Sequence, residues 1–177
     1  MALTVGSLTK AVKVTLTRTA DTTTYAAGDV ISTATTGTSP LTFKSCAKNS
    51  RGGGLLQQLT IVSSQAASTK LAADLFLFDV APAAANYGDD NEAFAPTDAQ
   101  MTACIGHVTI AATDWVEGGA NAIVQKRGLA MPFKCSNSGG GSTDLYGVLV
   151  ARNAYVPISA EVFTITLHIL QDVKSGA

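Results

Sequence analysis

Strict alternation of apolar and mildly polar residues near the end of the chain constrains the fold more than any other sequence feature. One alternating set is wholly apolar and consists of Phe163, Ile165, Leu167 and Ile169. The set between them consists of Val162, Thr164, Thr166 and His168. Successive side chains of a strand point to opposite faces, so Glu161–Leu170 is predicted to be a strand with one face on a hydrophobic core. Its apolar, β-branched composition favours a central position in a sheet, beside a second predicted strand at Leu145–Arg152.

Further segments of β-type sequence precede these two strands. They are Ala11–Thr19, Val30–Ala34, Leu41–Cys46, Leu55–Ser63, Lys70–Val80, Cys104–Ala111, Asn121–Arg127 and Leu129–Lys134. In the first of them, Leu16 is expected to face inward and Arg18 to face outward. Lys70–Val80 is apolar on both faces, which predicts a strand inside a sheet, and it is expected to form a hairpin with Leu55–Ser63.

Turn-forming and glycine-rich sequences separate the predicted strands. Lys48–Gly54 and Ser136–Asp144 are predicted to be flexible loops, because their glycines carry no side chains that pack. Asp114–Gly119 is predicted to be a turn. Thr97 and Gln100 have the spacing of a capping box, which predicts one short helix that ends near residue 103.

The sequence therefore predicts an all-β fold with one domain. It is expected to be an antiparallel β-sandwich of eight to ten short strands with one short helix, and a jelly-roll-like arrangement is the leading candidate. Residues 12–177 are expected to form this domain. Residues 1–11 have no clear hydrophobic period, and we expect them to form an N-terminal arm that contacts a neighbouring subunit.

Composition and charge exclude several classes of protein. The net charge is −1 and the basic residues are scattered, which argues against a nucleic-acid partner. No apolar run approaches the roughly 18 residues of a membrane span, so no membrane partner is expected. The first residues lack the basic and apolar regions of a signal peptide. Three widely spaced cysteines do not suggest a disulfide framework, so we expect folding in the cytoplasm with the thiols as apolar filler.

No residue of the sequence is assigned a catalytic, cofactor-binding or metal-ligating role. Cys104 and His107 are expected to lie on opposite faces of their strand, and His168 to lie at the surface or an interface. The glycine runs Gly52–Gly54 and Gly139–Gly141 are not followed by helical sequence, so they do not indicate a phosphate-binding loop.

An acidic cluster is the one constellation that suggests a metal. It consists of Asp89, Asp90 and Glu92, beside Asn86 and Asn91. Carboxylate and amide oxygens bind Ca²⁺ or Mg²⁺, but the spacing is not that of an EF-hand loop, so a solvated loop is favoured.

Aromatic residues in or beside the predicted loops allow two interpretations. They are Tyr25, Tyr87, Trp115 and Tyr155. Exposed aromatic rings form platforms for sugars or partner proteins. The favoured interpretation is that these residues cap the ends of the sandwich.

Four stretches of sequence resemble small β-rich virion proteins encoded among the structural genes of tailed bacteriophages. They are VTLTRTADTTTYAAGDV at Val14–Val30, LAADLFLFDVAP at Leu71–Pro82, DNEAFAPTDAQMTACIGHVTI at Asp90–Ile110 and LYGVLVARNAYVPISAEVFTITLHIL at Leu145–Leu170. None of these stretches is a catalytic signature. The glycine-rich loops Gly52–Gly54 and Gly139–Gly141 depart from the family pattern.

The resemblance implies a non-enzymatic virion structural protein. The expected role is that of a capsid decoration or cement protein, which binds the major capsid protein on the virion surface after synthesis in the host cytoplasm. Symmetric placement favours a homo-oligomer, a trimer before a dimer. The alternative is a carbohydrate- or receptor-binding module of a head fibre or tail. The mild outer face of Glu161–Leu170 is a candidate contact with a neighbouring molecule.

Overall fold

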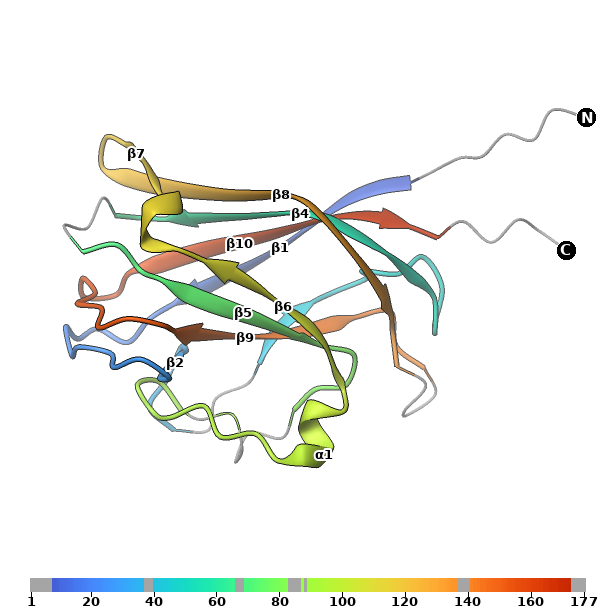
Figure 1. The fold of residues 1–177 in the computed structure, drawn as a ribbon, viewed down its shortest axis with the longest axis horizontal. Helices are drawn as coiled ribbons and strands as arrows, with labels where there is room; N and C mark the ends of the chain where they lie inside the picture. The colour runs from blue at the N-terminus through green and yellow to red at the C-terminus, as the bar shows by residue number, and fades with distance from the viewer. Residues whose placement is uncertain are drawn as a thin grey trace, which may run out of the picture.

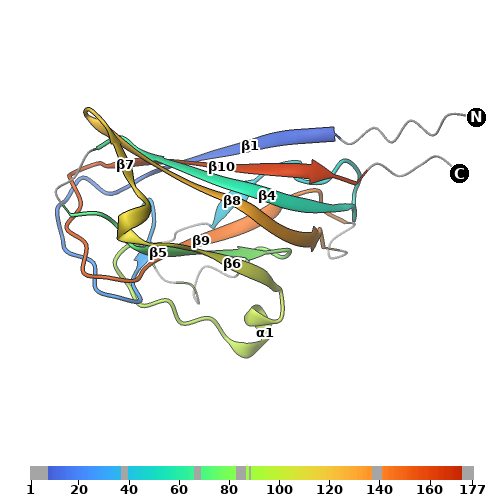
Figure 2. The same ribbon diagram turned by 45° about the horizontal axis from the view of Figure 1, so that its top comes forward.

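Two antiparallel sheets packed against each other make up the fold (Figures 1 and 2). The computed structural model describes residues 8–36, 40–65, 69–82, 87, 89–136 and 141–172. The first sheet has the order β1 (Leu8–Thr17), β10 (Val162–Gln171), β4 (Gly53–Ser63), β8 (Asn121–Lys134) and β7 (Val116–Gly118). The second has the order β2 (Val30–Ile31), β9 (Leu145–Ala151), β5 (Ala73–Phe78) and β6 (Cys104–Ile110), and β3 (Leu41–Phe43) also pairs with β9.

The strand pairs are nested along the chain. The first strand pairs with the last, β2 and β3 pair with β9, β4 pairs with β8, and β5 pairs with β6. This is the connectivity of one long hairpin that has rolled up, and rolling adds the pairs between β10 and β4 and between β9 and β5. The predicted all-β sandwich with jelly-roll-like topology is confirmed.

Strand β10 is the central element of the core, as its alternation predicts. It is hydrogen-bonded to β1 on one side and to β4 on the other. Its inward side chains are fully buried, and these are Phe163, Ile165, Leu167 and Ile169. Burial of an aliphatic or aromatic side chain stabilises a fold by about 1.5–3 kcal/mol, so this face is a main source of stability.

The predicted hairpin between Leu55–Ser63 and Lys70–Val80 is wrong. These segments become β4 and β5, which lie in different sheets. Both edges of β4 are already occupied, because it pairs with β10 and with β8. The chain therefore crosses from one sheet to the other between the two strands. The prediction that β5 lies inside a sheet is confirmed, since it pairs with β6 and β9.

Two predicted boundaries also change. Asn121–Arg127 and Leu129–Lys134 are one strand, β8, because Gly128 adopts a positive φ of 68° and forms part of a bulge instead of ending the strand. Gly53 and Gly54 belong to β4 rather than to a flexible loop. A Cβ atom on Gly54 would lie 2.6 Å from the carbonyl oxygen of Leu170, so close pairing requires glycine there.

The predicted turn at Asp114–Gly119 is partly extended. Ala112–Asp114 forms one 3₁₀ turn, and the next residues form the short edge strand β7. The predicted helix is confirmed as α1 (Asp98–Met101). Thr97 is its N-cap, and Thr97 and Gln100 make both hydrogen bonds of a capping box.

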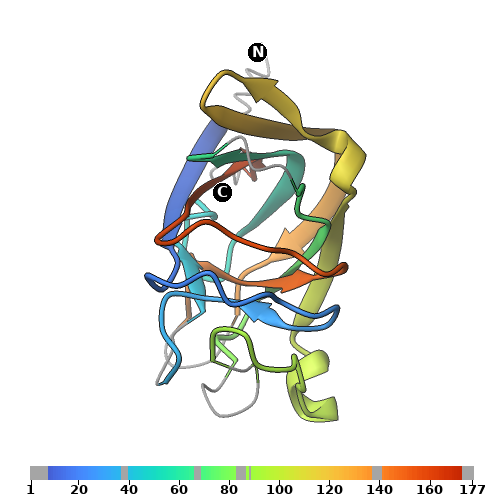
Figure 3. The same ribbon diagram turned by 90° about the vertical axis from the view of Figure 1, so that its left-hand side faces the viewer.

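A second hydrophobic cluster covers the outer face of the second sheet. Outward side chains of β5 and β9 pack there against Tyr87 and Phe94, and the Phe76 and Phe94 ring centroids are 4.8 Å apart. The connection that carries Phe94 and α1 passes over this side of the molecule (Figures 1 and 3). The two sheets therefore differ, since no such connection crosses the outer face of the first sheet in the described residues.

The expected N-terminal arm is shorter than predicted. Strand β1 begins at Leu8, which pairs with Gln171 at the end of β10, so residues 8–11 belong to the sheet. The rest of the arm, residues 1–7, lies outside the described residues. Both ends of the described chain leave the sandwich on the same side (Figure 1).

Candidate functional site

The predicted acidic cluster is not a solvated loop around Asp90. Asp90 is only 4% exposed. Its carboxylate accepts hydrogen bonds from the Tyr25 hydroxyl (2.6 Å), the Ser32 N–H (2.8 Å) and the Thr19 hydroxyl (2.8 Å). Because protein donors occupy both carboxylate oxygens, Asp90 has a structural role. Asn86 lies outside the described residues, and among the described residues no group of three or more His, Cys, Asp or Glu could hold a metal ion.

Arg18 is the cationic partner of Asp90, contrary to the prediction that it faces outward. Its side chain is 0% exposed, and its NH2 lies 3.6 Å from Asp90 Oδ2. Its Nε donates to the hydroxyl of Tyr25, whose ring the guanidinium also covers at 4.6 Å from the centroid. Burial alone lowers the pKa of Arg18, but the bond to Tyr25 and the nearby carboxylates raise that pKa overall. The cation therefore stays charged inside the sandwich.

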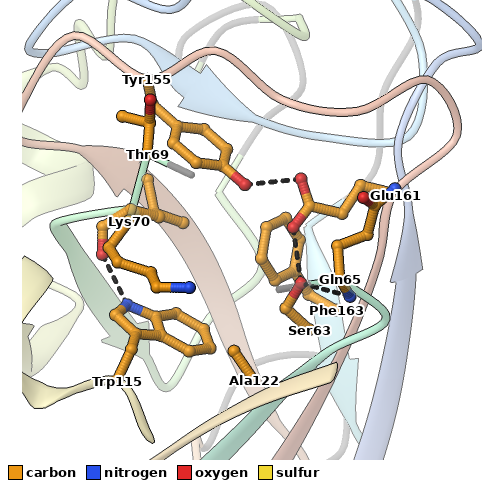
Figure 4. Close-up of a pocket in the computed structure, with 10 residues that line it drawn as sticks. Ser63, Gln65, Thr69, Lys70, Trp115, Ala122, Tyr155, Glu161 and Phe163 are labelled. Carbon is orange, nitrogen blue, oxygen red and sulfur yellow. Dashed lines mark hydrogen bonds between the residues drawn. The ribbon is translucent and has the colours of Figure 1, made fainter. Parts of the chain in front are cut away.

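A second buried carboxylate lies beside this cluster, in the cavity of Figure 4. Glu161 is 1% exposed and accepts hydrogen bonds of 2.6 Å from the Ser63 hydroxyl and from the Tyr155 hydroxyl. The cavity beside them has a volume of about 10 Å³, which is enough for one water molecule. A serine, a glutamate and a tyrosine are thus brought together, but in a space that admits no substrate.

Tyr25 and Tyr155 cap the end of the sandwich, as the favoured interpretation predicts, whereas Tyr87 packs on the outer face of the second sheet. Tyr25, Tyr87 and Tyr155 are 0%, 3% and 2% exposed. Tyr25 and Tyr155 form an isolated β-bridge with stacked rings, and burial raises the pKa of both hydroxyls. Trp115 is half-buried, and its Nε1 donates to the Leu71 carbonyl at 2.7 Å. The tyrosines therefore cannot form the exposed platform that motivated the carbohydrate-binding alternative.

The prediction that Cys104 and His107 lie on opposite faces is wrong. A bulge between them makes Cys104 the partner of Phe78 and His107 the partner of Phe76, so both lie on one side of β6. All three cysteines are free thiols. Cys46 and Cys135 are buried, and burial raises their pKa values to about 12 and about 11. These two residues fill the core as predicted.

The bare outer face of the first sheet is the candidate functional site. It consists of the outward side chains of four adjacent strands, and we call this set the outer face. Strand register assigns to it Thr9, Ala11, Lys13, Thr15 and Thr17 of β1, Val162, Thr164, Thr166, His168 and Leu170 of β10, Leu55, Gln58, Thr60 and Val62 of β4, and Ile123, Gln125, Arg127, Pro132 and Lys134 of β8. All of these residues are exposed or half-buried.

The composition of the outer face differs from that of an ordinary solvent surface. Threonine dominates it, and none of its residues is an Asp or a Glu. Its charged residues are Lys13, Arg127 and Lys134, and His168 Nε2 lies 3.4 Å from Thr60 Oγ1. Ten residues at about 3.3 Å each and four strands at about 4.8 Å spacing give a footprint of roughly 600 Å². That size approaches the roughly 800 Å² that each partner buries in a standard protein interface.

No protein-family model matches the sequence, and no curated protein is significantly similar to it. In the described part of the chain, no helix has the length and apolar character needed to span a membrane. The function is therefore argued from the geometry of the described residues.

Proposed function

We propose that this chain is a non-enzymatic structural protein of a bacteriophage virion, which decorates the capsid and binds the major capsid protein through the outer face. The observation that carries the proposal is the contrast between the two sheets. The chain's own residues cover the second sheet with a hydrophobic cluster, whereas the outer face of the first sheet is bare and has few charges. The sequence resemblance to phage virion proteins supports the same conclusion.

The outer face suits a cement protein because it is rigid before binding. Its two central strands, β10 and β4, are hydrogen-bonded on both sides, so docking orders little backbone. Short threonine and valine side chains lose little rotamer freedom on burial. A decoration protein adds interface area across boundaries between capsid subunits, so that pressure from packaged DNA must break more contacts.

The charges on the outer face define the partner surface. Lys13 and Arg127 face outward with no acidic neighbour in the set, so the complementary surface carries carboxylates. We propose that the protein binds the capsid as a homo-oligomer, a trimer or a dimer, because closed symmetric assemblies are the commonest oligomers. Synthesis and folding take place in the host cytoplasm before attachment.

Binding to capsids that lack the protein tests the proposal. Thr164 lies on the outer face, between Thr15 and Val62. Thr164→Glu places a negative charge there, and we expect at least tenfold weaker binding. The matched control is Ala99→Glu, which makes the same charge change at an exposed residue of α1. Equal binding by both variants and the original protein would refute the use of this face.

Heating the particles tests the cement role separately. Particles that carry the protein are expected to release DNA at a higher temperature than particles without it. Particles with Thr164→Glu added in excess are expected to behave like undecorated ones. Identical release temperatures with and without the original protein would contradict a stabilising function, even if the protein binds.

A further inference from the structure

A recess in the outer face marks a specific contact within it. The recess has a volume of about 460 Å³, and its lining includes Thr9, Gln57, Gln58, Arg127 and His168. Residues from β1, β4, β8 and β10 meet there. The volume falls within the range of small-ligand sites, although the recess is open to solvent.

Irregular strand pairing creates this recess. Between the pairs Leu56–Met131 and Gln58–Arg127, β8 has three residues (128–130) opposite the single residue Gln57 of β4, so the extra residues are in β8. Relative to β10, Gln57 is itself the extra residue, because the register shifts after His168. Bulges bend strands and redirect side chains, and they are frequent beside functional sites. The bend of β8 is visible in Figure 1.

Strained backbone lies at the same place. Opposite the bulge in β4, Ala130 adopts a φ of 46°, a conformation that side chains other than glycine rarely adopt. Such strain persists only where the surroundings impose it, and it clusters at sites with a function. A regular, flat sheet would avoid this cost, so the distortion is a second observation that points to the recess.

The residues that line the recess are basic or uncharged. Arg127 contributes a guanidinium, Gln57 and Gln58 contribute amide groups, and His168 contributes an imidazole. No acidic residue is among the lining residues. Arg127 NH2 donates to Gln125 Oε1 at 2.6 Å, and since a guanidinium has five N–H donors, others remain for a ligand. Planar guanidinium groups bind carboxylates with two parallel hydrogen bonds.

We propose that the recess receives a carboxylate side chain from the capsid protein surface, with Arg127 as the principal ligand and Gln57, Gln58 and His168 as further contacts. This inference rests on the proposed function and assigns its partner contact. A protruding Asp or Glu of the partner enters the recess and fixes how the two proteins are aligned. The threonine residues of the outer face contribute most of the buried contact area. The recess is thus the specific part of the outer face.

A direct binding measurement on the purified protein tests the chemistry of the recess. The probe is the capped peptide acetyl-Gly-Glu-Gly-amide, titrated to tens of millimolar while NMR follows the backbone and side-chain N–H signals. We expect shifts of Arg127, Gln57 and Gln58 with this peptide and not with the matched Gln peptide, and we expect Arg127→Gln to abolish them. Equal shifts with both peptides, no shifts, or shifts that survive in the variant would overturn the assignment. Tighter binding of inorganic phosphate would also overturn it, in favour of a phosphate ligand.

Capsid binding separates this inference from the proposed function. Arg127→Gln is expected to weaken binding at least tenfold, which corresponds to about 1.4 kcal/mol. Lys13→Gln makes the same charge change on the same face outside the recess and is expected to have less than about a threefold effect. If Thr164→Glu prevents binding and Arg127→Gln does not, the recess inference fails and the proposed function stands. If the original protein does not bind capsids but the Glu peptide binds in an Arg127-dependent way, the proposed function fails and the carboxylate site stands without its assigned partner.

Discussion

Replacement of Asp90 tests whether the buried polar cluster holds the end of the sandwich together. The Asp90 carboxylate accepts three hydrogen bonds, from Thr19, Tyr25 and Ser32, and faces the fully buried cation of Arg18. Hydrogen bonds to a charged group contribute about 1.5–3 kcal/mol each, and the Arg18 cation loses one of its two carboxylate partners, since Asp21 Oδ1 stays 3.3 Å from its Nη2. We therefore expect Asp90→Ala to lower the free energy of unfolding by about 3–5 kcal/mol.

Asp90→Asn separates the charge from the hydrogen bonds. The Tyr25 hydroxyl and the Ser32 N–H both bind Asp90 Oδ1, and the amide oxygen of Asn keeps an acceptor in that position. The expected loss is smaller than for Asp90→Ala by about 1–2 kcal/mol, because these two hydrogen bonds are kept while the charge is lost in both variants. A double-mutant cycle with Arg18→Leu is expected to give a coupling energy of about 1–3 kcal/mol, because the two residues share one network.

Urea denaturation followed by the fluorescence of Trp115, the only tryptophan, measures these losses. The control is Glu92→Ala, since the Glu92 side chain is exposed, and a change within about 0.5 kcal/mol is expected there. A loss below about 1 kcal/mol for Asp90→Ala, with an unchanged urea dependence, would refute the reasoning. It would mean that the cluster contributes little and that the apolar core alone fixes this end of the fold.

Three further predictions concern packing, thiols and acid. Gly54→Ala is expected to destabilise the fold by about 1–3 kcal/mol, because its Cβ would lie 2.6 Å from a backbone oxygen. Gly118→Ala should change stability little in the same urea assay, because its Cβ would lie 3.9 Å from the carbonyl oxygen of Asn121. Cys46 and Cys135 are expected to resist a thiol reagent at pH 8 in the native protein and to react in urea, because burial raises their pKa values. Rapid labelling of either cysteine in the native protein, located by mass spectrometry, would contradict this prediction. Hydrogen bonds from Lys126 and a backbone N–H hold the pKa of Asp114 below its ordinary value. Its contribution to stability is therefore present above about pH 4 and is lost as the pH falls further. Asp114→Asn should flatten this part of the curve of stability against pH, and an unchanged curve would contradict the prediction.

The sequence predicts the core of this fold well because period-two alternation has a direct physical meaning. The apolar set from Phe163 to Ile169 is buried as expected, and the capping box at Thr97 forms as its spacing predicts. Sheet membership is harder to predict, because β4 and β5 follow each other along the chain and still lie in different sheets. Which edges remain free depends on pairing with strands that are distant in sequence.

The buried charges could have been located from the same alternation. Arg18 follows Leu16 by two positions, and Glu161 precedes Phe163 by two, so both lie in phase with inward residues. A charged residue in an inward phase at the end of a strand predicts a buried polar cluster. Asp90, the partner of Arg18, could not be found in this way, because it lies in a connection that has no hydrophobic periodicity.

The recess in the outer face could not be predicted from the sequence either. Gly128 suggested a break between two strands, whereas it belongs to a bulge inside one strand. Gln57 is an extra residue relative to β10, whereas β8 has the extra residues relative to β4, so the distortion depends on the register of β4 with two neighbours at once. Register is a property of the folded sheet, so the contacts of Arg127 and His168 appear only in three dimensions.

Three-dimensional image reconstruction of capsids after addition of the purified protein is the most direct test of the central claim. We expect density for the sandwich on the capsid surface, with β1, β10, β4 and β8 facing the shell and α1 facing solvent. Density in which the covered side, with Phe94 and α1, faces the shell would contradict the assigned surface. Capsids without added density at saturating protein would contradict the proposed function itself.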